Sequence, residues 1–294
     1  MKLSVIIPSY NTAQLLSKTI ELLRTRLQEH MDRDEYEIMV VDNHSTDETT
    51  TWLKKQKDII SILNAENVGF SRANNQGIER ARGTYVLLLN SDVLLDQAID
   101  FNRLIAFLEE DKKRGALTIK LYTNTTQIDP ACHRGFPTPI NALWYFTGLE
   151  QLTRSVPFLA RVFGGYHLTW LPFSTTHEID CPTAAFFLAK KKAIDEVGGF
   201  DPDYFFYAED IDLCYRLKEN GWTIWFYPHA AALHLKYQSG QKNHDDTAAR
   251  RKSRYWFFKS MGMFYDKHYQ SRYPSWLNGL VHMTVTGMTR QYAP

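Results

Sequence analysis

Carboxylate side chains follow two apolar runs in the first hundred residues. Asp42 comes directly after the run Glu37–Val41, and Asp92 follows the run Tyr85–Leu89 within three residues. An aspartate in such a place can accept hydrogen bonds from a nucleobase, and a second one can hold a divalent cation, because Mg²⁺ prefers one or two carboxylates completed by substrate phosphates. The pair predicts a nucleoside diphosphate site. For either residue alone, satisfying loop N–H groups is an equal alternative.

A second group of carboxylates lies in the stretch FFYAEDIDLCYRL, residues 205–217, which contains Glu209, Asp210 and Asp212. Asp212 and Arg216 have the i, i+4 spacing of an ion pair on a helix surface, which gives Asp212 a structural role. Glu209 and Asp210 fall in the expected first turn, where the helix dipole favours acids whatever their function. The same dipole keeps a carboxylate ionised at neutral pH, as a general base requires. Helix start and general base both remain open from these residues alone.

The elements that must position these acids follow an α/β pattern. Short apolar runs alternate with amphipathic segments, as expected for βαβ units that build a mostly parallel sheet. In such sheets ligands bind at the carboxyl ends of the strands, so Asp42 and Asp92 are predicted at one edge. The predicted strands of this half are Leu3–Ile7, Glu37–Val41, Ile59–Leu63, Tyr85–Leu89 and Ala116–Leu121.

The second half is less regular. Residues 123–178 are rich in Pro, Gly and aromatic residues, which predicts a functional insertion or a mobile region. Strands are expected again at Ala184–Ala189, Thr223–Tyr227 and Ala230–His234. We predict one domain over residues 1–242, with a nucleotide-binding half (1–122) and an acceptor-binding half (123–242), followed by an amphipathic helical tail (243–294).

Composition excludes several classes of protein. The 294 residues carry a formal net charge of +1, so no overall field attracts nucleic acid, and we expect no nucleic-acid partner. The three cysteines are far apart and without CxxC spacing, which argues against disulfides and zinc and favours a reducing cytosol. We expect no signal peptide, and no stretch has the roughly 18 uncharged apolar residues of a membrane span.

Six ordered motifs resemble those of family 2 glycosyltransferases, which have the GT-A fold with a single Rossmann-like, mostly parallel sheet flanked by helices. The resemblance covers most of residues 1–240, and the combination of NSD, EDIDLCYRL and a late His followed by SG is similar to rhamnosyltransferase-like members. The motifs are SVIIPSYN (4–11), VVDNHSTDET (40–49), NVGFSRANNQGIERARG (67–83), LLLNSD (87–92), GGFDPDYFFYAEDIDLCYRLKENGW (198–222) and ALHLKYQSG (232–240).

The resemblance assigns a nucleotide and donor site. It implies that Asp42 contacts the base, that the loop after the first strand edges the nucleotide, and that the following helix and the NSD motif border the nucleotide and sugar. The residues implied for this site are Pro8, Tyr10, Asn11, Asp42, Asn67, Gly69, Arg72, Asn75, Asn90 and Ser91.

The resemblance also implies a metal site for Mg²⁺ or Mn²⁺. Asp92 corresponds to the last acid of the family's DXD motif, whereas Asn90 replaces the first acid and removes one charge. His234 corresponds to a late histidine that completes the metal shell in some members. A packed histidine at a strand end is the alternative for His234, and His229 competes for the same role.

The implied activity is inverting sugar transfer in bacterial cell-surface polysaccharide synthesis. Asp210 would be the base and Glu209 a partner in the acceptor site, with Phe205, Phe206 and Tyr207 expected as core packing rather than a sugar platform. The donor would be dTDP-L-rhamnose or a UDP-sugar, and the acceptor a glycan or lipid-linked glycan. A nucleotide-sugar-binding assembly subunit without turnover is the alternative. A nucleotidyltransferase is less expected, because PSYNTAQ is no glycine-rich phosphate loop.

The tail combines basic residues with aromatics. Arg250–Lys259 interleaves the two kinds, and Trp276–Met288 places apolar residues on one helical face. Such a helix can lie on a membrane surface, or it can pack on its own domain or on a second subunit as a homodimer. We expect a cytoplasmic protein, with peripheral contact at the inner face of the cell membrane as one of these equal alternatives.

Overall fold

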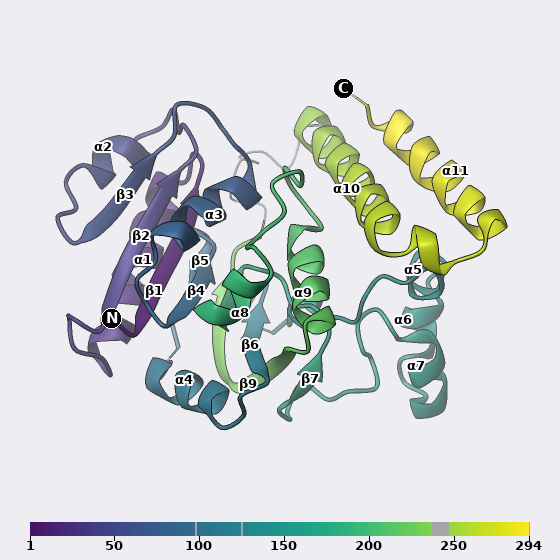
Figure 1. Ribbon diagram of the computed structural model, residues 1–294, viewed down its shortest axis with the longest axis horizontal. Helices are drawn as coiled ribbons and strands as arrows, with labels where there is room; N and C mark the ends of the chain where they lie inside the picture. The colour runs from purple at the N-terminus through teal and green to yellow at the C-terminus, as the bar shows by residue number, and fades with distance from the viewer. Residues whose placement is uncertain (98, 125, 237–246, 294) are drawn as a thin grey trace.

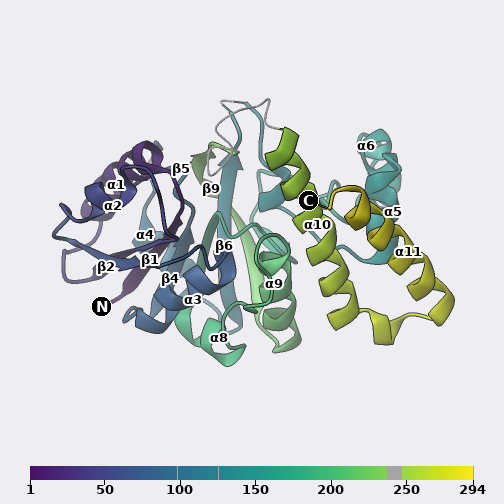
Figure 2. The same ribbon diagram turned by 90° about the horizontal axis from the view of Figure 1, so that it is seen from above.

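The computed structural model of the protein describes residues 1–97, 99–124, 126–236 and 247–293. In it a mixed β-sheet runs through the middle of the molecule, with helices on both of its faces (Figures 1 and 2). The strand order is β3-β2-β1-β4-β8-β6-β9-β5, and β7 also pairs with β9. This arrangement confirms the predicted α/β class.

The first half of the chain alternates strands with helices, as its sequence pattern predicts. β1 pairs in parallel with β2 and β4, and β2 with β3. Every residue of β2 and β4 is buried, because helices cover both faces of a parallel sheet. The elements are β1 (Leu3–Ser9), α1 (Ala13–Gln28), β2 (Tyr36–Asp42), α2 (Thr49–Leu53), β3 (Ile59–Leu63), α3 (Phe70–Arg80), β4 (Tyr85–Leu89), β5 (Val93–Leu94), α4 (Phe101–Glu109) and β6 (Arg114–Tyr122).

The second half completes the sheet and adds a helical end to the molecule. β8 runs antiparallel between β4 and β6, whereas β9 is parallel to β6. The elements are η1 (Pro130–Cys132), α5 (Pro139–Phe146), α6 (Leu149–Thr153), α7 (Pro157–Phe163), β7 (His177–Ile179), β8 (Phe186–Lys190), α8 (Lys191–Glu196), α9 (Glu209–Glu219), β9 (Thr223–His234), α10 (Thr247–His268), η2 (Gln270–Arg272) and α11 (Ser275–Gln291).

The segment 123–178 is more regular than its composition predicted. Its described residues contain the 3-10 helix η1, three short α-helices (α5–α7) and most of the strand β7. Pro139 and Pro157 are the first residues of α5 and α7, where proline costs no hydrogen bond, and the Thr138 side chain caps α5 by accepting from Asn141 N–H. Several of the prolines that suggested irregular chain are therefore helix starts.

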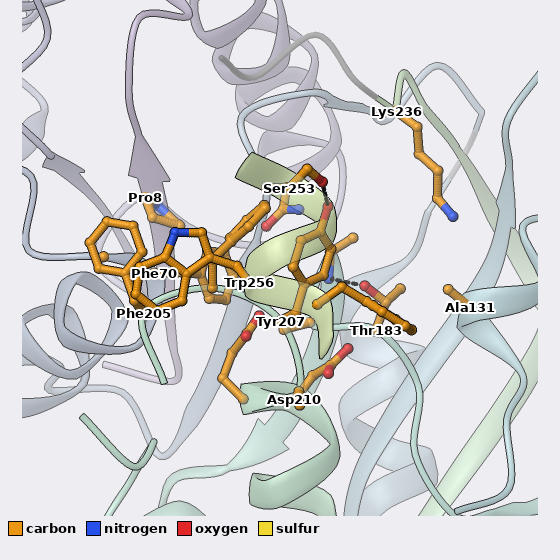
Figure 3. A pocket seen from close by; sticks show the side chains of 18 of the residues that line it. Pro8, Phe70, Ala131, Thr183, Phe205, Tyr207, Asp210, Lys236, Ser253 and Trp256 are labelled. Atoms are coloured by element: carbon orange, nitrogen blue, oxygen red, sulfur yellow. Dashed lines mark hydrogen bonds between the residues drawn. The ribbon is translucent and has the colours of Figure 1, made fainter. Parts of the chain in front are cut away.

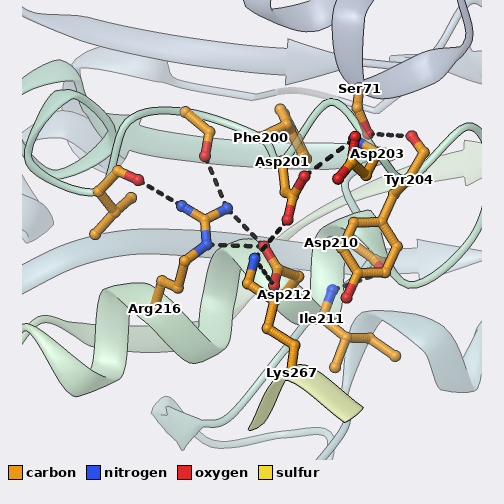
Figure 4. Close-up of polar contacts among 12 residues, drawn as sticks. Ser71, Phe200, Asp201, Asp203, Tyr204, Asp210, Ile211, Asp212, Arg216 and Lys267 are labelled. Carbon is orange, nitrogen blue, oxygen red and sulfur yellow. Dashed lines mark hydrogen bonds and ion pairs between the residues drawn. The ribbon is translucent and has the colours of Figure 1, made fainter. Parts of the chain in front are cut away.

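Helix α10 is joined to α9 through a buried carboxylate. The expected Asp212–Arg216 ion pair forms at 2.7 Å, but Asp212 is fully buried and not on a helix surface (Figure 4). α10 covers this face of α9 and brings Lys267 and His268 to within 2.8 and 2.7 Å of Asp212 Oδ1. Burial acts to raise the pKa of Asp212, but the hydrogen bond from His268 and the charges of Arg216 and Lys267 lower it to about 2.

The C-terminal helices pack against the rest of the molecule. Side chains of α10 contact Asp212 and Tyr215 of α9, and α11 packs on α10 (Figures 1 and 2). The predicted boundary at residues 242 and 243, and the residues YQSG of the last motif, lie in 237–246, outside the described residues. What the described part establishes is that α10 belongs to the same packed body as the sheet.

Candidate active site

A cavity of about 490 Å³ lies at the carboxyl ends of the central strands. The ends of β1 and β9, the loop after β4, the start of α9 and the middle of α10 all contribute to its wall (Figure 3). This is the edge of the sheet where the sequence pattern predicts a ligand site.

The cavity collects most of the predicted site residues. Asn11, Asp42, Arg72 and Asn75 do not line it. The predicted residues that line it are Pro8, Tyr10, Asn67, Gly69, Asn90, Ser91, Asp92, Glu209, Asp210 and His234.

Asp42 and Asn11 hold two loops together behind the cavity wall. The carboxylate of Asp42 accepts hydrogen bonds from the Ser45 hydroxyl (2.5 Å) and the Ser45 N–H (3.0 Å). Asn11 N–H donates to Ser45 Oγ at 2.8 Å, and Asn11 Oδ1 accepts from Thr46 N–H at 2.7 Å. In this structure Asp42 satisfies loop N–H groups, the alternative that its sequence position left open.

Arg72 and Asn75, on α3, contact the turn that leads to α9. The Asn75 amide donates to the Phe200 carbonyl (2.7 Å) and accepts from the Phe200 N–H (2.8 Å). Arg72 Nε donates to the Pro202 carbonyl at 3.2 Å. These contacts position the backbone ahead of the acidic helix start rather than face the cavity.

Gly69 has a steric role in the same wall. Its φ is +86°, and a Cβ there would come within 2.8 Å of Phe205. Phe70 N–H also donates to the Phe205 carbonyl at 3.0 Å. The start of α3 and the aromatic segment before α9 are thus in direct contact, which only glycine at position 69 allows.

Asp210 forms an ion pair that its sequence context did not indicate. Asp210 Oδ2 accepts from Arg134 Nη2 at 2.7 Å, with the two side chains 13% and 11% exposed. Asp210 Oδ1 accepts from the N–H of Ile211 at 2.8 Å. Arg134 comes from the segment 123–178, so that segment delivers a functional group to the cavity. No periodicity or motif marked Arg134 as the partner.

Glu209 differs from its neighbour. Its side chain is buried, and its Oε2 has no hydrogen-bond partner among the described residues. Burial, together with the nearby charge of Asp210, raises the pKa of Glu209 to about 8. This shift favours the protonated form of Glu209 at neutral pH. A first-turn acid was expected to be ionised, but at Glu209 the cost of burial outweighs the helix dipole.

The metal candidates Asp92 and His234 lie side by side. His234 ends β9 in register with Val93, and its Nε2 is 3.5 Å from Asp92 Oδ1. His234 Nδ1 lies 3.1 Å from Asp129 Oδ2, and Lys236 Nζ donates to Asp129 Oδ1 at 2.6 Å. Sequence reasoning missed Asp129 and Lys236. His229 does not line the cavity.

Burial and neighbouring charges shift the pKa values of His234 and Asp129 in this cluster. Burial acts to lower the pKa of His234, but hydrogen bonds to Asp129 and Asp92 raise it to about 9. Burial acts to raise the pKa of Asp129, but the hydrogen bond from His234 and the charge of Lys236 lower it to about 2. These shifts favour an ion pair between His234 and Asp129.

The donor set fits a cation that substrate phosphates help to coordinate. In the described part of the chain, no three His, Cys, Asp or Glu side chains form a group that could hold a metal by themselves. Asp92 and His234 offer one carboxylate and one imidazole nitrogen at the cavity, and Asp129 supports the other ring nitrogen, as carboxylates do for metal-binding histidines. Mg²⁺ accepts such a set when phosphates complete its shell.

Helix α10 closes the cavity on the side that sequence reasoning left open. Trp256 stacks on Phe205 with ring centroids 4.9 Å apart, and Ser253 Oγ lies 2.6 Å from the Tyr207 hydroxyl (Figure 3). Phe205, Phe206 and Tyr207 line the cavity, so the expectation of core packing was wrong for them. The expectation failed because these aromatics contact Trp256 and Ser253 of α10, and together with them they line the cavity.

The chain matches models of two glycosyltransferase families. The model of "Glycosyl transferase family 2" matches residues 4–171, more than half of the chain. The model of "Glycosyl transferase family group 2" matches residues 165–292. The two matches together include the sheet, the cavity and both C-terminal helices.

Curated relatives point in the same direction. The uncharacterized glycosyltransferase YfnE of Bacillus subtilis is 25% identical over 281 residues, which cover 85% of this chain and 68% of YfnE. The N-acetylglucosaminyl-diphospho-decaprenol L-rhamnosyltransferase of Mycobacterium tuberculosis is 42% identical over 71 residues, which cover 24% of this chain and 23% of that protein. Across the first curated relatives that it matches, the chain spans 15% to 68% of their length.

A solved structure shares the fold. The mannosyltransferase PcManGT from Pyrobaculum calidifontis, solved in complex with GDP-Man and Mn²⁺, is similar with a TM-score of 0.59 at 16% identity, covering 99% of this chain and 73% of that chain. This likeness confirms the predicted GT-A architecture.

Proposed function

The chain belongs to glycosyl transferase family 2, and from that premise we propose that it moves a sugar from a nucleoside diphosphate donor to a hydroxyl group of an acceptor glycan, with inversion. One observation carries the proposal: a single cavity holds the carboxylate of Asp210 on one wall and the Asp92–His234 pair on another. Inverting transfer needs these two functions, a base for the acceptor and positive charge for the leaving diphosphate.

Asp210 acts as the base. The acceptor oxygen attacks the anomeric carbon, the bond from that carbon to the diphosphate oxygen breaks with its electron pair, and the acceptor's proton passes to Asp210. Attack from the face opposite the leaving group inverts the configuration in one displacement. Asp92 and His234 would hold Mg²⁺ or Mn²⁺, which as a Lewis acid neutralises charge on the departing diphosphate. Glu209, buried beside Asp210, contacts the acceptor.

The donor loops are those that line the cavity. Pro8 at the end of β1, Tyr10 just after it, Asn67 and Gly69 before α3, and Asn90 and Ser91 after β4 line the cavity and would border the nucleotide and its sugar. Asp42, Asn11, Arg72 and Asn75 support these loops through the contacts described above. In this assignment Asp42, which does not line the cavity in this structure, reaches the base only if the wall in front of it moves on binding.

We propose dTDP-L-rhamnose as the first donor to test, with UDP-sugars next. The 71-residue similarity to a rhamnosyltransferase that acts on a diphospho-decaprenol glycan supports both this donor and a glycan or lipid-linked glycan acceptor. The process would be synthesis of a bacterial cell-surface polysaccharide. An assembly subunit that binds nucleotide sugars without turnover is the alternative, favoured by Asn90 at the first position of the metal motif.

A donor screen tests the proposed activity. The protein is incubated with dTDP-L-rhamnose, UDP-glucose, UDP-N-acetylglucosamine and GDP-mannose, with Mg²⁺ or Mn²⁺ and with EDTA, and released nucleoside diphosphate is measured. We expect release from one donor that requires the metal and rises when a polyprenyl-diphosphate glycan is added. Saturable donor binding by calorimetry without release, with or without acceptor, would instead support the assembly subunit.

We also propose that the helical end of the molecule contacts an anionic membrane surface. α5–α7 and α11 lie at the same end (Figures 1 and 2), and all four carry exposed apolar side chains. Leu152 is 76% exposed, Phe158 74% and Trp276 69%. The described helices include none long and apolar enough to cross a membrane, so the contact is peripheral.

Charge at this end favours a lipid surface over a second subunit. Residues 139–163 and 247–293 contain ten Lys or Arg but only two Asp or Glu, in a chain whose net charge is +1. Of the two acids, Glu150 is buried against His167. Arg154 and Arg161 are exposed among the apolar residues. Basic residues beside exposed apolar side chains bind anionic lipid headgroups, whereas two such surfaces would repel each other. The three described cysteines are free and buried, which suits the cytoplasmic face proposed here.

Vesicle binding tests this surface. Phe158→Ser with Trp276→Ser should weaken sedimentation with phosphatidylglycerol vesicles by about tenfold or more, because two large apolar contacts are lost. Leu63→Ser is the matched control, since Leu63 is 45% exposed on β3 at the other end of the molecule. Equal binding by all three proteins, or a concentration-dependent dimer that the double variant dissociates, would contradict the membrane proposal.

A further inference from the structure

Two neighbouring carboxyl groups face the same cavity, and one arginine contacts only one of them. Arg134 Nη2 is 2.7 Å from Asp210 Oδ2. Glu209 precedes Asp210 in the chain, is buried, and has its Oε2 without a hydrogen-bond partner among the described residues. Two adjacent carboxyl groups in a buried site resist double ionisation, because each negative charge raises the energy of the other. The surroundings of the two carboxyl groups therefore determine which of them is ionised.

Arg134 is held in place by the backbone around it. Its own carbonyl accepts from Asp180 N–H (3.1 Å) and Cys181 N–H (3.0 Å), and its Nε donates to the Cys181 carbonyl at 3.3 Å. The N–H of the next residue, Gly135, donates to the Tyr166 carbonyl at 2.8 Å. These contacts, within the segment 123–178 and with the connection between β7 and β8 at Cys181, therefore hold the guanidinium next to Asp210.

Other titratable groups near Asp210 do not compete with Arg134 at neutral pH. Burial raises the pKa of Tyr166 to about 12, in spite of the Arg134 charge, and raises the pKa of the Cys181 and Cys214 thiols well above their usual range. All three are neutral. Among the cations of the cavity wall, His234 and Lys236 are bound to Asp129. Lys252, on α10, also lines the wall.

We propose that Arg134 confines the negative charge of the Glu209–Asp210 pair to Asp210, so that Asp210 takes the acceptor's proton while Glu209 keeps its own and donates a hydrogen bond to the acceptor. This inference rests on the proposed sugar transfer. During transfer the acceptor O–H bond breaks, its proton moves to Asp210, and the oxygen's electron pair forms the bond to the anomeric carbon. Arg134 touches no reacting atom and is a positioning residue.

A direct measurement of the two protonation states does not depend on activity. In protein labelled with ¹³C at the side-chain carboxyls of Asp and Glu, Asp210→Asn and Glu209→Gln spectra assign the two resonances. At pH 6.5 we expect Asp210 at the position of a carboxylate and Glu209 at that of a carboxylic acid. In Arg134→Gln protein the Asp210 resonance should move towards the protonated position. Glu209 ionised and Asp210 protonated in wild type, or no change in Arg134→Gln, would overturn the inference.

Kinetics provide the second readout. With an active donor, Arg134→Gln should move the acid limb of the kcat/KM profile to higher pH by about one to three pH units, because an adjacent arginine favours ionisation of an aspartate by that amount. Arg134→Lys should restore most of the profile, and Arg103→Gln, an exposed arginine on α4, should not change it. An equal loss of activity at every pH, without rescue by Arg134→Lys, would show that Arg134 has only a structural role.

The two failures can be told apart. If wild type releases nucleoside diphosphate from no donor and the ¹³C resonances still show Asp210 charged and Glu209 neutral, the proposed sugar transfer fails but the charge assignment stands. If wild type is active and Arg134→Gln leaves both the resonances and the pH profile unchanged, the role of Arg134 fails and the sugar transfer stands.

Discussion

Asp210→Asn is expected to lower kcat by about a hundred- to ten-thousandfold, the usual contribution of a positioned general base. Asparagine keeps the shape of the side chain and an oxygen that can accept from Arg134, but it cannot take a proton from the acceptor. Steady-state kinetics with the donor found active should show the loss in kcat, with nucleotide affinity by calorimetry within a few-fold of wild type.

Asp203→Asn is the matched control for this change. Asp203 is exposed, lies seven residues earlier in the same approach to α9, and does not line the cavity. Its substitution should leave kcat unchanged. Near-wild-type activity of Asp210→Asn would remove the base assignment, and Glu209→Gln would then be the variant to measure. Because Asp210 pairs with the buried Arg134, circular dichroism and thermal unfolding must show that both variants are folded.

Asp92→Ala is expected to abolish the metal dependence of the enzyme and to reduce kcat/KM by about a hundred- to thousandfold, since a Lewis acid at the leaving group contributes several kcal/mol and each 1.36 kcal/mol is tenfold in rate. His234→Ala should cause a smaller loss, because one carboxylate would remain as a ligand. Binding gives a readout apart from turnover: Mn²⁺ should tighten UDP and dTDP binding to wild type, measured by calorimetry, but not to Asp92→Ala.

The buried surroundings of Asp92 require two further variants. Asp92 lies 3.5 Å from His234, so Asp92→Asn, which keeps the volume and polarity, separates loss of the ligand from disturbance of the wall. Asp96→Asn is the control, because Asp96 is exposed just beyond β5. An unchanged metal requirement in both Asp92→Ala and His234→Ala would exclude this pair as the metal site.

Much of the fold could be predicted because burial leaves a pattern in the chain. β2 and β4 are covered on both faces, so they appear in the sequence as continuous apolar runs. The short helices α5 and α7 could not be recognised in the same way. Their first-turn prolines resemble loop signals. Their apolar residues are largely exposed, so they do not form the buried stripe by which a core-facing helix is recognised.

The candidate site was predictable where chain geometry alone brings residues together. Asp92 follows a parallel strand and was expected at a ligand-binding edge from that position, whereas Asp210 was placed in the site only by the resemblance. Asp42 occupies an equivalent position, yet its carboxylate is bound to Ser45. A strand-end position therefore indicates the edge of the sheet but not the direction in which a side chain points.

The sequence by itself determined the α/β pattern and the strand-end position of Asp92, because these depend on patterns that recur every few residues, and its motifs carried the family resemblance that implied roles for Glu209 and Asp210. Only the tertiary structure decided the charges at that edge. Arg134 reaches Asp210 across 76 residues, and Asp129 reaches His234 across 105. Such pairs carry no local period, and their effect depends on burial, which raises the pKa of Glu209 and places the Asp212 carboxylate between α9 and α10.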